Sequence, residues 1–226
     1  MLITIDSVLN DAQLQAIHQQ LQSVPNHWHD GGLTAGPVAN AIKNNHQLAS
    51  DSPVLQSIGT TVLQALQQHP VFFSAALPLN SFPPRINRHG VGEYYGNHYD
   101  NAVLGQPGNY VRSDVSCTVF LSDPSQYTGG ELCIQDTFGT HRIKLAAGSA
   151  VIYPSSSLHQ VAPVTEGERI GCFFWMQSMV RSSEQRRLLY DLDMAITELR
   201  SQHGSDSNIT QLTGTYHNLL RMWSEL

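Results

Sequence analysis

Residues 150–175 read AVIYPSSSLHQVAPVTEGERIGCFFW, and this stretch decides the fold class. Two runs of β-branched, aromatic and small apolar residues, Ala150–Tyr153 and Arg169–Met176, flank residues typical of turns and loops. Runs of this length and composition, bounded by turn residues, predict β-strands. The stretch therefore favours a sandwich or barrel.

The same texture extends toward the amino terminus. Three further runs predict strands: Val115–Leu121, Glu131–Gln135 and His141–Leu145. Together they give a chain that is mainly β in its middle, starting near residue 80.

Helical periodicity marks both ends of the chain. We expect a first helix capped by Asp11, and a second that starts at Ser52-Pro53. After Ser182, apolar residues recur at helical spacing in two more segments. Residues 25–50 are rich in Pro, Gly, Asn and His and predict irregular structure. The expected organisation is a helical support region at 1–79, a β domain at 80–178 and a helical extension at 179–226.

Composition narrows the class of protein. The net charge is -6 with only 12 Lys+Arg, which argues against nucleic-acid or anionic-membrane binding. No apolar run is long enough for a membrane span, and the amino terminus lacks the features of a signal peptide. The three cysteines, Cys117, Cys133 and Cys172, do not suggest a disulfide framework. We expect a cytoplasmic protein with no membrane or nucleic-acid partner.

Three residues suggest a metal site. His98 and Asp100 form a His-x-Asp pair, and on a strand both side chains would project from one face. Alone, the pair is close to a chance match, and a polar surface strand explains it equally well. His159 follows the Ala150–Tyr153 run through a short turn, which places it to point into a barrel mouth. Two His and one carboxylate are the facial ligand set of non-haem Fe(II).

Arg169 adds an anion-binding group to this pattern. It stands ten residues after His159, at the start of the next predicted strand. A guanidinium is costly to bury unless a carboxylate meets it, and its planar fork binds carboxylates through two hydrogen bonds. An exposed strand Arg is the alternative. The joint pattern favours an iron site, with Arg169 suited to bind the distal carboxylate of 2-oxoglutarate.

The chain resembles the PKHD-type hydroxylases, a bacterial prolyl-4-hydroxylase-like family of Fe(II)- and 2-oxoglutarate-dependent oxygenases. The resemblance covers nearly the whole chain. It is carried by Ile86-Asn87-Arg88, Gly96–Ala102, Phe120–Pro124, Gly129–Leu132, Tyr153–His159, Phe174–Ser178 and Tyr216–Arg221.

The resemblance implies a double-stranded β-helix (jelly-roll) core with flanking helices. It also implies that His98, Asp100 and His159 bind Fe(II) and that Arg169 binds 2-oxoglutarate, with O2 as oxidant and L-ascorbate as a reductant. Relatives usually carry Tyr where this chain has His89. If that Tyr holds the cosubstrate, His89 must replace it, or the role moves to Tyr95 or Thr118.

The resemblance predicts a dioxygenase that hydroxylates a peptidyl proline or a small molecule and converts 2-oxoglutarate to succinate and CO2. Two alternatives of other classes stay open from the residues alone. One is a jelly-roll hydrolase or isomerase that uses the same ligands with another divalent ion. The other is a non-catalytic sensor of a metal or a small acid. The carboxy-terminal helices could also pair two subunits as a homodimer.

Overall fold

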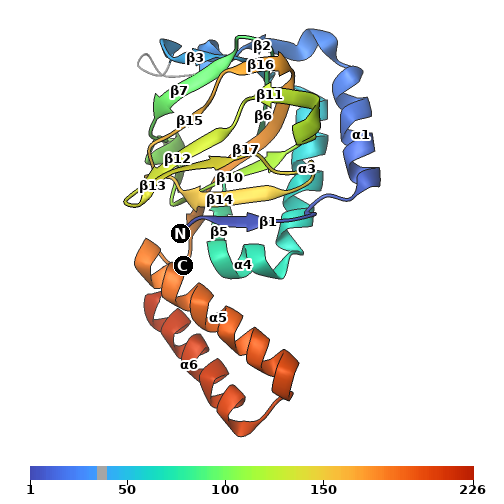
Figure 1. The fold of residues 1–226 in the computed structure, drawn as a ribbon. Helices are drawn as coiled ribbons and strands as arrows, with labels where there is room; N and C mark the ends of the chain where they lie inside the picture. Colours follow the sequence, from blue (N-terminus) through green and yellow to red (C-terminus); the bar gives the residue numbers. More distant parts are fainter. Residues whose placement is uncertain (35–39) are drawn as a thin grey trace.

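The computed structural model describes residues 1–34 and 40–226, and its largest element is an eight-stranded antiparallel sheet (Figure 1). Its central strand is β17 (Arg169–Ser178), which pairs with β10 (Val115–Phe120) on one side and with β6 (Arg85–His89) on the other. The remaining strands are β14 (Ala150–Pro154), β1 (Ile3–Ile5), β4 (His46–Leu48), β2 (Trp28–Asp30) and β5 (Pro78–Ser81).

A five-stranded antiparallel sheet faces the large one and closes the jelly roll. It runs in the order β13 (Gly139–Ile143), β12 (Leu132–Asp136), β15 (His159–Val161), β7 (Tyr94–His98) and β3 (Lys43–Asn44). Two separate two-stranded antiparallel sheets complete the β structure of the described residues. One pairs β11 (Tyr127–Gly129) with β16 (Val164–Gly167), and the other is a hairpin of β8 (Val103–Gln106) and β9 (Asn109–Arg112). The expected jelly-roll fold is confirmed.

Alternation along β10 explains how the large sheet separates an apolar face from a polar one. Successive side chains of a strand point to opposite faces. Val115, Cys117 and Val119 belong to the main hydrophobic core, whereas Ser116 and Thr118 line a cavity between the sheets. All five are buried. The polar face therefore lies inside the jelly roll.

The main core forms between the large sheet and two helices, α1 (Asp11–Gln22) and α3 (Pro53–Gln67), which run along its outer face (Figure 1). α3 begins at Pro53 as expected, and its apolar face is buried: Leu55, Ile58, Val62 and Leu66. The expected cap of α1 is shifted by one residue. Asn10, not Asp11, accepts the capping hydrogen bond from Gln13 N, and the Asn10 backbone N–H donates to Gln13 Oε1.

Several short elements were not expected from the sequence. β1 and the seven-residue helix α4 (Pro70–Ala76) fall in stretches with too few residues to show a period. The region 25–50, expected to be irregular, holds β2, β3 and β4 and the short 3-10 helices η1 (Pro25–His27) and η2 (Gly31–Thr34). A third 3-10 helix, η3 (Pro124–Gln126), precedes β11. The two- and three-residue strands β1 to β4 form because they pair with neighbouring strands, not because of local propensity.

The carboxy-terminal helices α5 (Ser183–His203) and α6 (Ser207–Trp223) form a hairpin that projects from the jelly roll (Figure 1). Their buried side chains meet one another: Leu189, Ile196, Ile209 and Tyr216, with Leu77 and Val180 at the base. Much of the apolar surface of α5 and α6 is thus buried within the hairpin. The homodimer and the division at residues 79 and 178 stay predictions. Among the described residues, no helix has the length and apolar character to cross a bilayer.

Candidate active site

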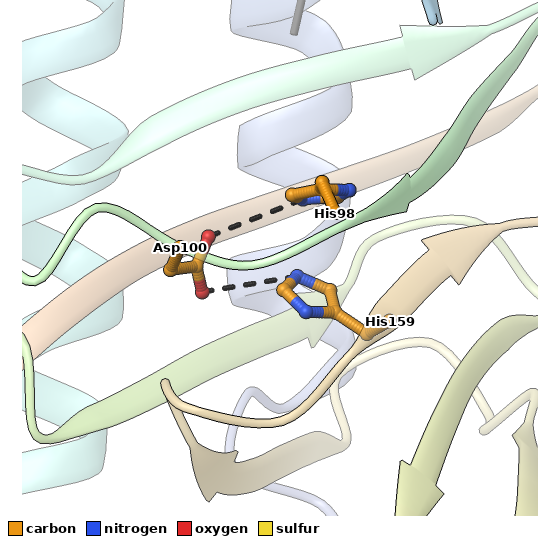
Figure 2. A group of neighbouring side chains, drawn as sticks. All are labelled: His98, Asp100 and His159. Carbon is orange, nitrogen blue, oxygen red and sulfur yellow. Dashed lines mark ion pairs between the residues drawn. The ribbon is translucent and has the colours of Figure 1, made fainter. Parts of the chain in front are cut away.

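The three residues of the expected metal site come together at the ends of two adjacent inner strands of the small sheet. His98 ends β7, and His159 begins β15, the neighbouring strand, directly opposite His98 in the register. Asp100 lies just beyond β7, so the two side chains converge without sharing a strand face as the sequence had suggested. Asp100 Oδ1 lies 4.0 Å from His98 Nε2, and Oδ2 lies 3.7 Å from His159 Nε2 (Figure 2).

Each imidazole is oriented by a backbone carbonyl two residues earlier. His98 Nδ1 donates to the carbonyl of Gly96 at 2.8 Å, and His159 Nδ1 donates to that of Ser157 at 3.0 Å. A proton on Nδ1 leaves Nε2 as a lone-pair donor, which is the usual arrangement of metal-binding His. Both Nε2 atoms face Asp100 (Figure 2). The side chains are therefore already in the tautomer that a metal requires.

Asp100 is held by hydroxyl groups of the large sheet and the loop beside it. Ser116 Oγ on β10 donates to Asp100 Oδ2 at 2.6 Å, and Ser155 Oγ lies 2.8 Å from Ser116 Oγ. The Asp100 side chain is only 7% exposed. This chain of hydroxyls fixes the carboxylate and links the metal site on one sheet to the strand that faces it.

Burial keeps His98 neutral. Its pKa is lowered, first by burial and then by the charge of His159. The ring of Tyr95 stacks on that of His98, with centroids 3.7 Å apart and an interplanar angle of 13°. Burial, and next the charge of Asp100, raise the pKa of Tyr95 to about 12, so it stays a neutral phenol. Tyr95 thus supports a ligand side chain.

The donor set fits Fe(II). Two neutral imidazoles and one carboxylate, with ligand atoms all within 4.8 Å of one another, can occupy one face of an octahedral ion and leave three positions open. His98, Asp100 and His159 are the one such group of three found among the described residues. Thiolate, which would favour zinc or an iron–sulfur cluster, is absent from the group.

Arg169 lies in the interior of the jelly roll, where it is 1% exposed. Its guanidinium lies over the ring of Phe120 at 5.3 Å, and Nε and Nη1 have no hydrogen-bond partner. Burial lowers its pKa, yet an Arg stays charged in proteins. A buried charge with donors that lack an acceptor is costly, and a carboxylate bound to the guanidinium would lower that cost. The residue therefore fits an anionic ligand.

Two residues shape the space around this guanidinium. Gly171 leaves room for it, since a Cβ there would lie 3.2 Å from Arg169 Nη1. His89, fully buried, stands opposite Arg169 in the register, and its Nε2 lies 3.0 Å from Asn45 Nδ2. Burial, and then the charge of Arg169, lower the pKa of His89 well below its usual value. Its Nδ1 has no partner, so this neutral imidazole has one polar atom to spare.

One cavity of about 660 Å³ joins the metal site to Arg169. Tyr95 and Thr118, the other expected cosubstrate residues, both line it, with Tyr95 against His98. The assignment of either to the cosubstrate stays a prediction.

Sequence reasoning missed several of the cavity's polar residues. Those on two strands of the large sheet carried a signal, because polar residues alternate with apolar or outward ones: Ser116 on β10, and Arg85 and Asn87 on β6. Lys43, on the two-residue strand β3, carried none.

Known proteins match the chain over its full length. Residues 84–177 match the 2OG-Fe(II) oxygenase superfamily, and residues 184–225 match the PKHD-type hydroxylase C-terminal domain. A PKHD-type hydroxylase of Azoarcus sp. (strain BH72) is 54% identical over 228 residues, and one of Polaromonas sp. (strain JS666 / ATCC BAA-500) is 52% identical over 228 residues. Each alignment covers 100% of both chains.

Solved structures match the fold. A Pseudomonas putida prolyl-4-hydroxylase has a TM-score of 0.54 at 16% identity, covering 78% of this chain and 92% of its own. A prolyl hydroxylase from Trichoplax adhaerens, in complex with a hypoxia inducible factor peptide fragment, has a TM-score of 0.57 at 14% identity, covering 83% and 86%. At these identities the likeness concerns the fold alone.

Proposed function

The chain belongs to the PKHD-type hydroxylases, enzymes of the 2-oxoglutarate- and Fe(II)-dependent oxygenase superfamily, and we propose that His98, Asp100 and His159 hold its iron. We further propose that Arg169 binds the distal carboxylate of 2-oxoglutarate. The product would be a hydroxylated peptide or small molecule. This reading sets aside the hydrolase, isomerase and sensor alternatives.

One observation carries the proposal. A buried Arg with two unpaired donors and a preorganised His–Asp–His group line the same cavity. Each half would be unusual alone, because a buried guanidinium needs an anion and the three ligand atoms need a cation. 2-Oxoglutarate has a carboxylate for the first and a chelating 2-oxo acid for the second.

The residues have separable roles in this scheme. Bound together, Fe(II) and 2-oxoglutarate activate O2, so that the substrate is hydroxylated while the cosubstrate is oxidatively decarboxylated to succinate and CO2. Arg169 orients the cosubstrate by its far end. Ser116 keeps the Asp100 carboxylate in place, and the backbone carbonyls of Gly96 and Ser157 keep each imidazole in its ligand tautomer.

Three further proposals concern the substrate, the reductant and the cellular compartment. Prolyl hydroxylases among the solved structures with this fold support a peptidyl proline as one candidate. We expect ascorbate to restore iron oxidised in turnovers without substrate. The three cysteines are free and buried, which supports a reducing compartment, and we infer the cytoplasm.

The test is stoichiometric. Purified protein should form succinate from 2-oxoglutarate only when Fe(II) and O2 are both present, with a slow uncoupled rate in the absence of substrate. A peptide library containing proline, and a fraction of small metabolites, should then be screened for faster succinate formation with matching gain of one oxygen atom. If succinate never forms under any of these conditions, the proposal is wrong.

A further inference from the structure

The cavity carries more positive charge than one cosubstrate carboxylate needs. The whole chain has a net charge of -6 and only 12 Lys+Arg. Three of these cations, Lys43, Arg85 and Arg169, line this cavity, and Asp100 is the one acidic residue among the described lining residues. The field inside the cavity is therefore opposite in sign to that of the molecule as a whole.

Arg85 lies far from the cosubstrate end of the cavity. It pairs with Phe173 across β6 and β17, whereas Arg169 pairs with His89. Four residues on one strand correspond to ~13 Å, so a carboxylate bound at Arg169 does not reach the Arg85 backbone position. The Arg85 guanidinium lies 6.0 Å from the ring centre of Trp175, and Trp175 stands opposite Ser116, the residue that holds Asp100. Arg85 thus belongs to the metal end.

Lys43 reaches the same end from the other sheet. It pairs with Tyr95 in the register of β3 and β7, and its ammonium lies 5.4 Å from the Tyr95 ring centre. The Tyr95 ring also stacks on His98, so Lys43 and a metal-ligand side chain contact the same ring. Lys43 is 9% exposed and donates to Gln47 Oε1 at 3.1 Å.

The charge of Arg85 disfavours protonation of Lys43. Burial, and next the charge of Arg85, lower the pKa of Lys43 to about 8, while the charge of Asp30 acts in the opposite direction, and burial lowers the pKa of Arg85. Lys43 nevertheless stays mostly protonated at neutral pH. No carboxylate of the described residues forms an ion pair with Arg85, whose face packs on Phe82 and Trp175 instead. Aromatic rings position the Arg85 guanidinium, whose charge acts on Lys43.

We propose that Lys43 and Arg85 form an anion-binding pair that holds a carboxylate or phosphoryl group of the substrate beside the metal end of the cavity. A buried and a half-buried cation of like charge are stabilised together by one anion, which each can meet with a charge-assisted hydrogen bond. The inference rests on the proposed function, since it assigns Arg169 to the cosubstrate and this pair to the substrate. It predicts an acidic substrate, or one with an acidic group near the reacting carbon.

The experiment measures binding of matched probes by calorimetry. The full-length protein is loaded anaerobically with Fe(II) and saturating 2-oxoglutarate, so that Arg169 is occupied. Two probe pairs are then titrated: N-acetyl-L-proline against N-acetyl-L-prolinamide, and phenyl phosphate against phenol. We expect at least one anion to bind roughly tenfold or more tightly than its neutral partner. The pair with the larger preference identifies a carboxylate or a phosphoryl group.

Substitutions show which residues cause the preference for the anionic probe. Lys43→Met and Arg85→Met should each reduce affinity for the anion by roughly 10- to 150-fold while affinity for the neutral partner changes little. Lys43→Arg and Arg85→Lys keep the charge and should retain most of the preference. The control is Arg142→Met, which removes an exposed cation of β13 and should bind like the wild type. A misfolded variant is recognised because it loses both members of a pair.

The outcomes separate the two proposals. A normal chelate band from Fe(II) and 2-oxoglutarate, with no preference for either anion, overturns this inference alone. A preference that survives in both Met variants also overturns it. If the wild type forms no chelate, the proposed function fails, and the preference is then measured on the metal-free Arg169→Met protein by the same criterion.

Discussion

The two ends of the cavity suit ligands of opposite charge, and they differ in how far their polar atoms are already hydrogen-bonded. At the metal end, hydrogen bonds already orient the ligand side chains: the Nδ1 atoms of His98 and His159 donate to backbone carbonyls, and Asp100 Oδ2 accepts from Ser116. At the Arg169 end, the guanidinium keeps two donors without partners, and the neighbouring His89 keeps one polar atom. The first end is prepared for a cation and the second for an anion.

The two ends should therefore gain their binding free energy from different sources. Preorganised ligands lower the cost of binding a metal, because tautomer and orientation are fixed in advance. The Arg169 end instead gains by relieving an unpaired buried charge, so anion binding there should also stabilise the fold.

The largest effect should follow removal of a ligand at the metal end. Asp100→Ala leaves two His and no charge to hold a divalent cation, so succinate formation should fall to background. Asp136→Ala is the matched control, because Asp136 also pairs with a His, His141, at 2.8 Å, but on an exposed hairpin. Full activity in the Asp100 variant would remove this residue from the ligand set.

At the other end, Arg169→Met should weaken 2-oxoglutarate binding while Fe(II) binding persists. A charge-assisted hydrogen bond contributes about 1.5–3 kcal/mol, which corresponds to a loss of roughly 10- to 150-fold. The dependence of succinate formation on 2-oxoglutarate concentration measures it. An unchanged dependence would show that the guanidinium faces some other partner.

A subtler change tests the shape of the same end. Gly171→Ala places a Cβ within 3.2 Å of Arg169 Nη1, so the guanidinium must shift, and we expect a loss of 2-oxoglutarate affinity smaller than in Arg169→Met. In the control Gly214→Ala, on α6, a Cβ meets no atom within 4 Å and should stabilise the helix by about 0.5–1 kcal/mol. Equal 2-oxoglutarate affinity in both variants would argue that the guanidinium moves freely.

The smallest effect concerns pH and His89. Its pKa is depressed by burial and by Arg169, so below pH ~6.5 the unfolded chain takes up a proton that folded His89 does not. The free energy of unfolding should therefore fall with decreasing pH, by at most about 1.4 kcal/mol per unit from this group.

Urea unfolding at several pH values checks this. His89→Gln should flatten the pH dependence below 6.5, whereas His203→Gln, on an exposed turn of α5, should follow the wild type. Parallel curves for wild type and His89→Gln would contradict the assignment of a depressed pKa.

The sequence allowed part of this picture to be predicted. The strands with clear alternation or turn boundaries, such as β10 and β17, and the candidate ligands near them followed from local pattern and from the family resemblance. β1 did not, because a three-residue strand is formed by pairing with β14, from Ile3 opposite Ile152. Lys43 was missed for the same reason. Only the tertiary fold brings residue 43 beside Tyr95 and near Arg85.

The most direct test of the central claim is an anaerobic titration. Fe(II) is added to the full-length protein with and without 2-oxoglutarate, and the visible charge-transfer band of the iron–2-oxo-acid chelate is followed. The two-ended cavity predicts a band that saturates at one Fe(II) and one 2-oxoglutarate per chain, is lost in Asp100→Ala, and needs more 2-oxoglutarate in Arg169→Met. A band of equal strength in all three proteins, or none in the wild type, would contradict it.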